Sequence, residues 1–202
     1  MEFILFIIVA YIIFRIFKNS KRDKIDLSIL PDEFIVFDLE TTGLSATIHE
    51  IIEIGAIKAY RDSDHHDTYQ TLVKPDKPIP SKITEITGIT QKMVDDEGID
   101  LETAINDFIE FIGDHRLVAY NMKFDIKFLR NAFKKFGKKI TNSTSCALVM
   151  ARRAWPELDS YKLTELAKIG GFDTTSSHRA LYDCEITMQV YATAAATLGA
   201  VS

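Results

Sequence analysis

The chain has 202 residues, of which 47% are hydrophobic and 26% are charged, and its formal net charge is −5. This length fits one globular domain with a short appendage, and the balance of apolar and charged residues excludes a disordered or fibrous chain. Residues 1–24 carry five Lys/Arg and two acids, which leaves 19 basic and 27 acidic residues, a net charge of −8, in the remainder. An acidic body of this kind excludes a protein that clamps long nucleic acid by charge alone.

The first distinct segment runs from Phe3 to Phe17 and is apolar except for Arg15. As a helix its 15 residues span about 23 Å, less than the roughly 30 Å of a bilayer core, but basic side chains at its end extend its reach. The basic residues follow the apolar run, which favours a following domain in the cytoplasm. The alternative is a peripheral or buried helix.

This pattern divides the chain into three parts. We expect residues 1–18 to form a hydrophobic N-terminal helix that anchors the chain in a membrane, mainly through residues 3–17. Residues 19–32 are polar and predict a linker. Residues 33–200 then form the folded domain, on the cytoplasmic side of the membrane.

A strand followed by two acids opens this domain, in the sequence Phe34-Ile-Val-Phe-Asp-Leu-Glu-Thr-Thr-Gly43. Four consecutive apolar residues predict a strand buried on both faces, at the centre of a sheet. Side chains alternate along a strand, so Asp38 and Glu40 project from one face with Cα atoms about 6 to 7 Å apart. Two carboxylates this close stay ionised together only when a cation lies between them. The alternative is a strand that ends in a polar, acidic turn.

Further strands and helices follow in alternation along the chain. The hydrophobic pattern predicts strands at residues 48–60, 68–73 and 116–120. Capping residues and apolar stripes predict helical segments that start at Ser81 and Thr90, a helix from Asp100 to Gly113, and helices at residues 121–136, 145–153, 161–169 and 179–198.

Two of these helices begin with candidate functional residues. Asp125 lies in the first turn of the helix that Asn121 begins, where an acid is also explained by the helix dipole. His178 and Asp183 stand at the start of the last helix. Five residues along a helix turn through about 500°, so these two side chains converge only if His178 belongs to the loop before the helix. The alternative for His178 alone is a capping or surface residue.

The three groups together resemble a known family. The order D-x-E after a strand, N-x-x-F-D at a helix start and H-x-x-x-x-D at a late helix start resembles the DEDDh 3′-to-5′ exonucleases, which include ribonuclease T and the proofreading subunit of DNA polymerase III. The resemblance covers about residues 33–196. Five segments are similar to the family in the same order: Phe37-Asp-Leu-Glu-Thr-Thr-Gly-Leu44, Ile52-Glu-Ile-Gly-Ala56, Val73-Lys-Pro75, Ile83-Thr-Glu-Ile-Thr-Gly-Ile89 and His178-Arg-Ala-Leu181.

The resemblance implies a fold and a set of site residues. The fold is an α/β, ribonuclease H-like domain with a central mixed β-sheet flanked by helices. Two divalent cations, Mg²⁺ or Mn²⁺, would be held by four acids, and a histidine, His178, would be the general base. The four acids are Asp38, Glu40, Asp125 and Asp183. The positions that line the slot for the terminal nucleotide are Thr41, Gly43, Leu44, Asn121 and Phe124.

The chemistry of phosphodiester hydrolysis needs these residue types. Charge develops on both the attacking and the leaving oxygen, and two divalent ions about 3.5 to 4 Å apart stabilise both, while carboxylate oxygens are the ligands that such hard cations select. An imidazole titrates close to neutral pH and can accept the proton of the attacking water.

We therefore expect a 3′-to-5′ exonuclease that releases nucleoside 5′-monophosphates from single-stranded DNA or RNA 3′ ends. Three alternatives stay open. One is a catalytically idle scaffold that binds nucleic-acid ends, another is an RNA-specific, oligoribonuclease-like enzyme, and the third is a hydrolase with a binuclear site that is not a nuclease.

Overall fold

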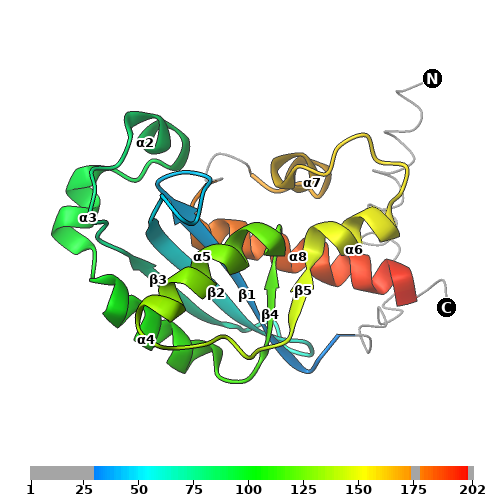
Figure 1. Ribbon diagram of the computed structural model, residues 1–202. Helices are drawn as coiled ribbons and strands as arrows, with labels where there is room; N and C mark the ends of the chain where they lie inside the picture. Colours follow the sequence, from blue (N-terminus) through cyan, green and yellow to red (C-terminus); the bar gives the residue numbers. More distant parts are fainter. Residues whose placement is uncertain (1–29, 174–177, 200–202) are drawn as a thin grey trace.

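A computed structural model describes residues 30–173 and 178–199 (Figure 1). Five strands form one sheet in the order β3-β2-β1-β4-β5. The strands are β1 (Glu33–Thr41), β2 (Ile51–Tyr60), β3 (Asp67–Leu72), β4 (Arg116–Ala119) and β5 (Thr144–Cys146). The helices are α2 (Ser81–Thr87), α3 (Gln91–Glu97), α4 (Leu101–Ile112), α5 (Met122–Lys135), α6 (Ala147–Ala154), α7 (Leu163–Ile169) and α8 (Ala180–Gly199).

The strand that carries the two acids lies at the centre of this sheet. β1 pairs antiparallel with β2 on one side and parallel with β4 on the other, so the sheet is mixed. The residues from Phe34 to Phe37 are all buried, as expected for a strand covered on both faces. The predicted α/β architecture, a central mixed sheet flanked by helices, is therefore confirmed.

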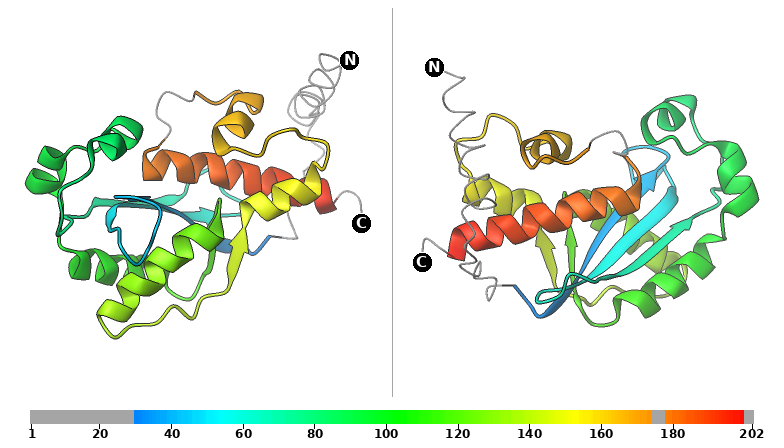
Figure 2. Two further views of the ribbon diagram at one scale, coloured as in Figure 1. Left: turned by 45° about the horizontal axis from the view of Figure 1, so that its top comes forward. Right: turned by 180° about the vertical axis from the view of Figure 1, so that it is seen from behind.

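Different helices cover the two faces of the sheet (Figures 1 and 2). Phe37 and Leu39 of β1 belong to one cluster of buried residues with Phe108 of α4 and Leu129 of α5. Val36 of β1 belongs to another cluster, which contains residues of α8. Because side chains alternate along a strand, the side chains of Asp38 and Glu40 project on the same side as Val36, towards α8.

The ends of several elements agree with the capping residues in the sequence. The Oγ1 of Thr90 accepts a hydrogen bond from the Met93 backbone N–H, and the Oδ1 of Asp100 accepts one from Thr103, so both residues cap helices as predicted. Asn121 occupies the N-cap position of α5, but its side chain makes no capping hydrogen bond.

Two predicted helices begin later than expected. The helix predicted over residues 145–153 starts at Ala147, because the residues before it form β5, which pairs in parallel with Leu117–Ala119 of β4. The helix predicted from residue 161 starts at Leu163, with Lys162 in the N-cap position. In the first case pairing with a neighbouring strand overrides the local helical pattern.

The prediction of a membrane-anchored protein is wrong for the part of the chain that the structure describes. Within residues 30–173 and 178–199, no helix is long and apolar enough to cross a membrane. The apolar segment 3–17, from which that prediction was made, and most of the predicted linker 19–32 lie outside the described residues.

Candidate active site

The end of β1 presents two acids to the helix that covers this face of the sheet. In the register of β1 and β2, Asp38 lies opposite Gly55 and Glu40 lies opposite Glu53. The register shifts between Glu40 and Thr41, so regular pairing ends directly after the second acid. The two acids therefore lie at the boundary between the sheet and the following turn.

A glycine on β2 lets the start of α8 approach the sheet at this point. A Cβ atom at Gly55 would lie 2.5 Å from the carbonyl carbon of Ala180 and from the backbone nitrogen of Leu181, closer than such atoms can approach. The Cys184 thiol also donates to the Gly55 carbonyl oxygen over 3.3 Å. Asp183, in the first turn of α8, is thereby held above the acids of β1.

His178 precedes α8, as its convergence with Asp183 requires. It has a left-handed backbone conformation, with φ of 68°, and its side chain is exposed. Its backbone N–H donates to Asp183 Oδ2 over 3.3 Å. The structure brings together ligand atoms of Glu40, His178 and Asp183 within 4.8 Å of one another, a spacing at which they can hold one metal ion.

The fourth acid reaches the cluster from a different helix. Asp125 lies near the start of α5, is only 3% exposed, and accepts a hydrogen bond from the backbone N–H of Leu39 on β1. Its charge is close enough to Asp38 to raise the pKa of that acid. The cluster therefore combines carboxylates from β1, α5 and α8, which are far apart in the sequence.

Burial raises the pKa of all four acids, and repulsion from other acids of the cluster adds to the rise for Asp38 and Glu40. Burial raises the pKa of Asp38 well above its usual range, and repulsion from Asp125, Glu40 and Asp183 adds to this effect. Burial, then repulsion from Asp183, raises the pKa of Glu40 to about 8. Burial likewise raises the pKa of Asp125 to about 7.

The pKa of Asp183 is also raised, mainly by burial, while the adjacent His178 opposes the shift. Cations would relieve the repulsion among these acids, and hard divalent cations prefer oxygen ligands of this kind. The donor set fits the predicted Mg²⁺ or Mn²⁺ in chemical type.

The last residue of β1 and the turn after it contain three of the residues predicted to contact the terminal nucleotide. The Thr41 hydroxyl donates to the Gly43 carbonyl oxygen over 2.8 Å, which fixes the start of the turn. A Cβ atom at Gly43 would lie 2.6 Å from the His49 ring, so a glycine fits here. The next residue, Leu44, exposes 86% of its surface.

Three of the five predicted nucleotide-binding residues line one pocket. Leu44, Asn121 and Phe124 border a pocket of about 210 Å³, whereas Thr41 and Gly43 are not among its lining residues. Lys123 and Lys127 of α5 also line this pocket. Apolar and cationic side chains thus meet at the start of α5.

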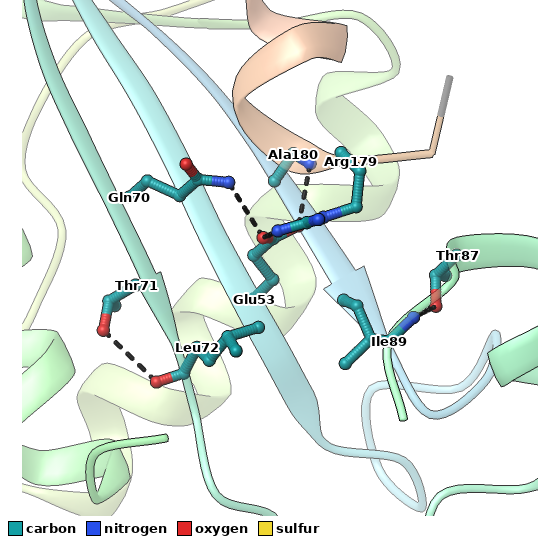
Figure 3. Close-up of polar contacts among 8 residues, drawn as sticks. All are labelled: Glu53, Gln70, Thr71, Leu72, Thr87, Ile89, Arg179 and Ala180. Carbon is teal, nitrogen blue, oxygen red and sulfur yellow. Dashed lines mark hydrogen bonds and ion pairs between the residues drawn. The ribbon is translucent and has the colours of Figure 1, made fainter. Parts of the chain in front are cut away.

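The site contains one buried acid, Glu53, that was not among the predicted site residues. Glu53 on β2 is fully buried and accepts hydrogen bonds from Arg179, from the backbone N–H of Ala180 and from Gln70 (Figure 3). Its position between Ile52 and Ile54 in a buried strand was the available signal, since a buried charge needs a partner. The identity of that partner depends on the fold.

Solved exonucleases have a similar fold. The E. coli exonuclease I complex with single-stranded DNA matches with a TM-score of 0.70 at 21% identity, covering 79% of this chain and 39% of that chain. Exonuclease X in complex with 5′ overhanging duplex DNA matches with a TM-score of 0.67 at 29% identity, covering 82% of this chain and 93% of that chain. The domain therefore has the ribonuclease H-like exonuclease fold that the sequence predicted.

Sequence comparisons define the family. The model of the RNase_T exonuclease family matches residues 35–191. DNA polymerase III subunit epsilon of Aquifex aeolicus is 35% identical over 174 residues, which are 86% of this chain and 85% of that protein. The PolC-type DNA polymerase III of Clostridium perfringens is 39% identical over 159 residues, or 79% of this chain, and the match spans only 11% of that polymerase. The chain belongs to the RNase_T exonuclease family, as its sequence predicted.

Proposed function

We propose that this protein removes nucleotides one at a time from single-stranded 3′ ends of nucleic acid and releases nucleoside 5′-monophosphates. The observation that carries this proposal is the meeting of Asp38, Glu40, Asp125 and Asp183 next to His178. Repulsion among four partly or fully buried carboxylates is costly without cations, and membership of the exonuclease family supports a role in phosphodiester hydrolysis.

The four acids would hold two divalent cations, Mg²⁺ or Mn²⁺. When bound, such ions stabilise the charge that develops on the attacking and leaving oxygens of a phosphodiester. Asp38 and Glu40 come from a central strand, while Asp125 and Asp183 come from the first turns of helices. Because all four stand on regular elements of the fold, their oxygen atoms are oriented before the substrate arrives.

His178 would act as the general base. Its ring lies within 4.8 Å of the carboxylates of Glu40 and Asp183, and it is exposed, so a water molecule can reach it. A neutral imidazole in this position accepts a proton from the attacking water. The nearby carboxylates stabilise the imidazolium that results.

The pocket at the start of α5 would receive the terminal nucleotide. Leu44 and Phe124 offer apolar surfaces against which a base can pack, and the ammonium groups of Lys123 and Lys127 attract phosphate. The net charge of −5 favours short, transiently held ends over long duplexes. The two solved complexes with DNA and the relationship to DNA polymerase III subunits support DNA as the substrate.

An assay with labelled oligonucleotides tests this function. The full chain is incubated with DNA and RNA oligonucleotides labelled at the 5′ or at the 3′ end, in Mg²⁺, in Mn²⁺ and in chelator. We expect a descending ladder from the 5′-labelled DNA and immediate release of a labelled mononucleotide from the 3′-labelled DNA, both abolished by chelator. Binding of the oligonucleotides without any shortening would overturn the proposal in favour of an end-binding scaffold.

A further inference from the structure

We infer that Glu53 and Arg179 form a positioning pair that fixes the start of α8 on the sheet, and with it His178 and Asp183 above the acids of β1. The inference rests on the proposed function, because it concerns the geometry of the same site. Glu53 lies opposite Glu40 across the β1–β2 ladder, and Arg179 immediately follows His178 in the sequence. The pair therefore connects the strand beside the acids to the segment that carries the histidine.

The hydrogen bonds of Glu53 show that it holds protein groups rather than a cation. Its Oε1 accepts from Arg179 Nη2 over 2.7 Å and from Gln70 Nε2 over 2.9 Å. Its Oε2 accepts from the Ala180 backbone nitrogen over 2.9 Å and from Arg179 Nε over 3.3 Å (Figure 3). A carboxylate offers about four lone-pair sites, so these contacts occupy Glu53 fully.

The contact with Ala180 is made at the first residue of α8. The first backbone N–H groups of a helix have no partner within the helix, and Glu53 provides one from the neighbouring sheet. On the same strand, Gly55 sets how closely α8 approaches, because a side chain there would collide with Ala180 and Leu181. Hydrogen bonds at Glu53 and close contact at Gly55 together determine where Asp183 lies, and a shift of about 1 Å at a reacting centre can cost about a hundredfold in rate.

Glu53 and Arg179 also affect the net charge near the acid cluster, and a test must distinguish this effect of charge from the effect of position. Glu53 is a fifth carboxylate near the four proposed metal ligands, and Arg179 neutralises it through a salt bridge. Substitutions Glu53→Gln and Arg179→Gln change the local charge in opposite directions, whereas both disrupt the paired hydrogen bonds between residues 53 and 179. An effect of charge alone therefore has opposite signs in the two variants, and an effect of position has the same sign.

The experiment measures turnover of a single-stranded DNA oligonucleotide at saturating Mg²⁺ by full-length variants. We expect Glu53→Gln and Arg179→Gln each to lower kcat by about tenfold or more, with KM changed by less than about threefold. Arg179→Lys keeps the charge but loses the planar fork, so it should recover only part of the rate. The double variant should be no slower than the slower single variant, because both changes remove one interaction.

A matched control is available at the other end of β2. Arg61 bonds to Asp32 over 2.6 Å, and Arg61→Gln removes an arginine–carboxylate pair remote from the site, so kcat should stay within about twofold of the wild type. A rate for Arg179→Gln that is also within about twofold of the wild type would overturn the inference. So would opposite changes of kcat in Glu53→Gln and Arg179→Gln.

Amide hydrogen exchange gives a second measurement that needs no catalytic activity. We expect the amides of residues 179–184 to exchange at least about tenfold faster in Arg179→Gln than in the wild type, while those in the middle of β2 stay protected. Unchanged exchange at the start of α8 would overturn the inference even if the wild type proved inactive. An inactive wild type with the expected exchange pattern would instead overturn only the proposed function. If Glu53→Gln does not fold, the Arg179 variants decide the outcome alone.

Discussion

Glu40 and Glu53 face each other across β1 and β2, but their surroundings differ. Glu53 is saturated by hydrogen bonds from protein groups, including Arg179. Glu40 lies within 4.8 Å of ligand atoms of His178 and Asp183, and burial and repulsion raise its pKa to about 8. Of these two neighbouring acids, Glu53 therefore binds groups of the protein, whereas Glu40 is available to a cation.

The first prediction concerns the acids proposed to hold cations. Asp38→Asn and Asp183→Asn should lower the rate of oligonucleotide hydrolysis in Mg²⁺ by more than about a hundredfold, because an amide is a much weaker ligand for hard cations. The melting temperature in chelator should stay equal or rise, since each change removes a charge from a repelling cluster. Both quantities are measured on the same preparations.

The control for these variants is Asp64→Asn, which makes the same chemical change in the exposed turn between β2 and β3. It should alter neither the rate nor the melting temperature. Retained turnover in Asp38→Asn or in Asp183→Asn would contradict the assignment of the acids.

The second prediction concerns the proposed general base. His178→Ala should lower kcat by about a hundredfold or more, the usual effect of losing a general base. His178→Asn should be equally slow, because asparagine tolerates the left-handed backbone, with φ of 68°, but cannot accept the proton as imidazole does. His65→Asn, in the exposed turn before β3, provides the control. A rate for His178→Asn within about twofold of the wild type would show that the ring has no part in proton transfer.

Much of the fold could be predicted because local signals and tertiary environment agree. The run from Phe34 to Phe37 predicts a strand covered on both faces, and it becomes the central strand β1. Asp100 predicts the start of α4 because a cap is a local interaction. β5 was missed because its three residues form a strand only by pairing with β4, an interaction with no local signal.

In the site, too, the features with a local sequence signal could be predicted and those that depend on tertiary contacts could not. The period of two along a strand predicts that Asp38 and Glu40 share a face, and the turn angle of a helix predicts that His178 must precede α8 to meet Asp183. The roles of Glu53 and Gly55 depend on contacts with Arg179 and Ala180 more than 120 residues away in sequence. Neither the composition of the chain nor the periodicity of its apolar residues predicts such long-range contacts.

The third prediction tests the close approach of α8 to the sheet. Gly55→Ala would place a methyl group 2.5 Å from the backbone of α8, and backbone atoms cannot move aside as a flexible side chain can. We expect a loss of about 1 to 3 kcal/mol in the free energy of unfolding and a fall in kcat of at least about tenfold. Chemical denaturation and the oligonucleotide assay measure the two effects.

Gly137→Ala is the matched control for this change. Nothing lies within 4 Å of a Cβ atom at Gly137, and its φ of 68° adds only a backbone cost of about 1 to 2 kcal/mol. Its stability should therefore fall while kcat is unchanged. If Gly55→Ala behaves in the same way, the approach of α8 does not determine the rate.

The fourth prediction concerns the dependence of stability on pH in the absence of divalent cations. The pKa of Glu40 is raised from 4.5 to about 8 and that of Asp125 from 3.8 to about 7. Between about pH 4 and pH 8 the folded chain therefore binds more protons than the unfolded chain. The stabilisation from these protonated acids is fully present below their unfolded pKa values and is lost as the pH rises through the folded ones.

In chelator, the melting temperature should thus fall by about 4 °C or more between pH 5 and pH 8. Mg²⁺ at pH 8 should restore most of this loss, because a ligand that binds only the folded state stabilises it. Glu40→Gln should flatten the profile and reduce the effect of Mg²⁺. A melting temperature that rises from pH 5 to pH 8 in chelator would contradict the raised pKa values on which this prediction depends.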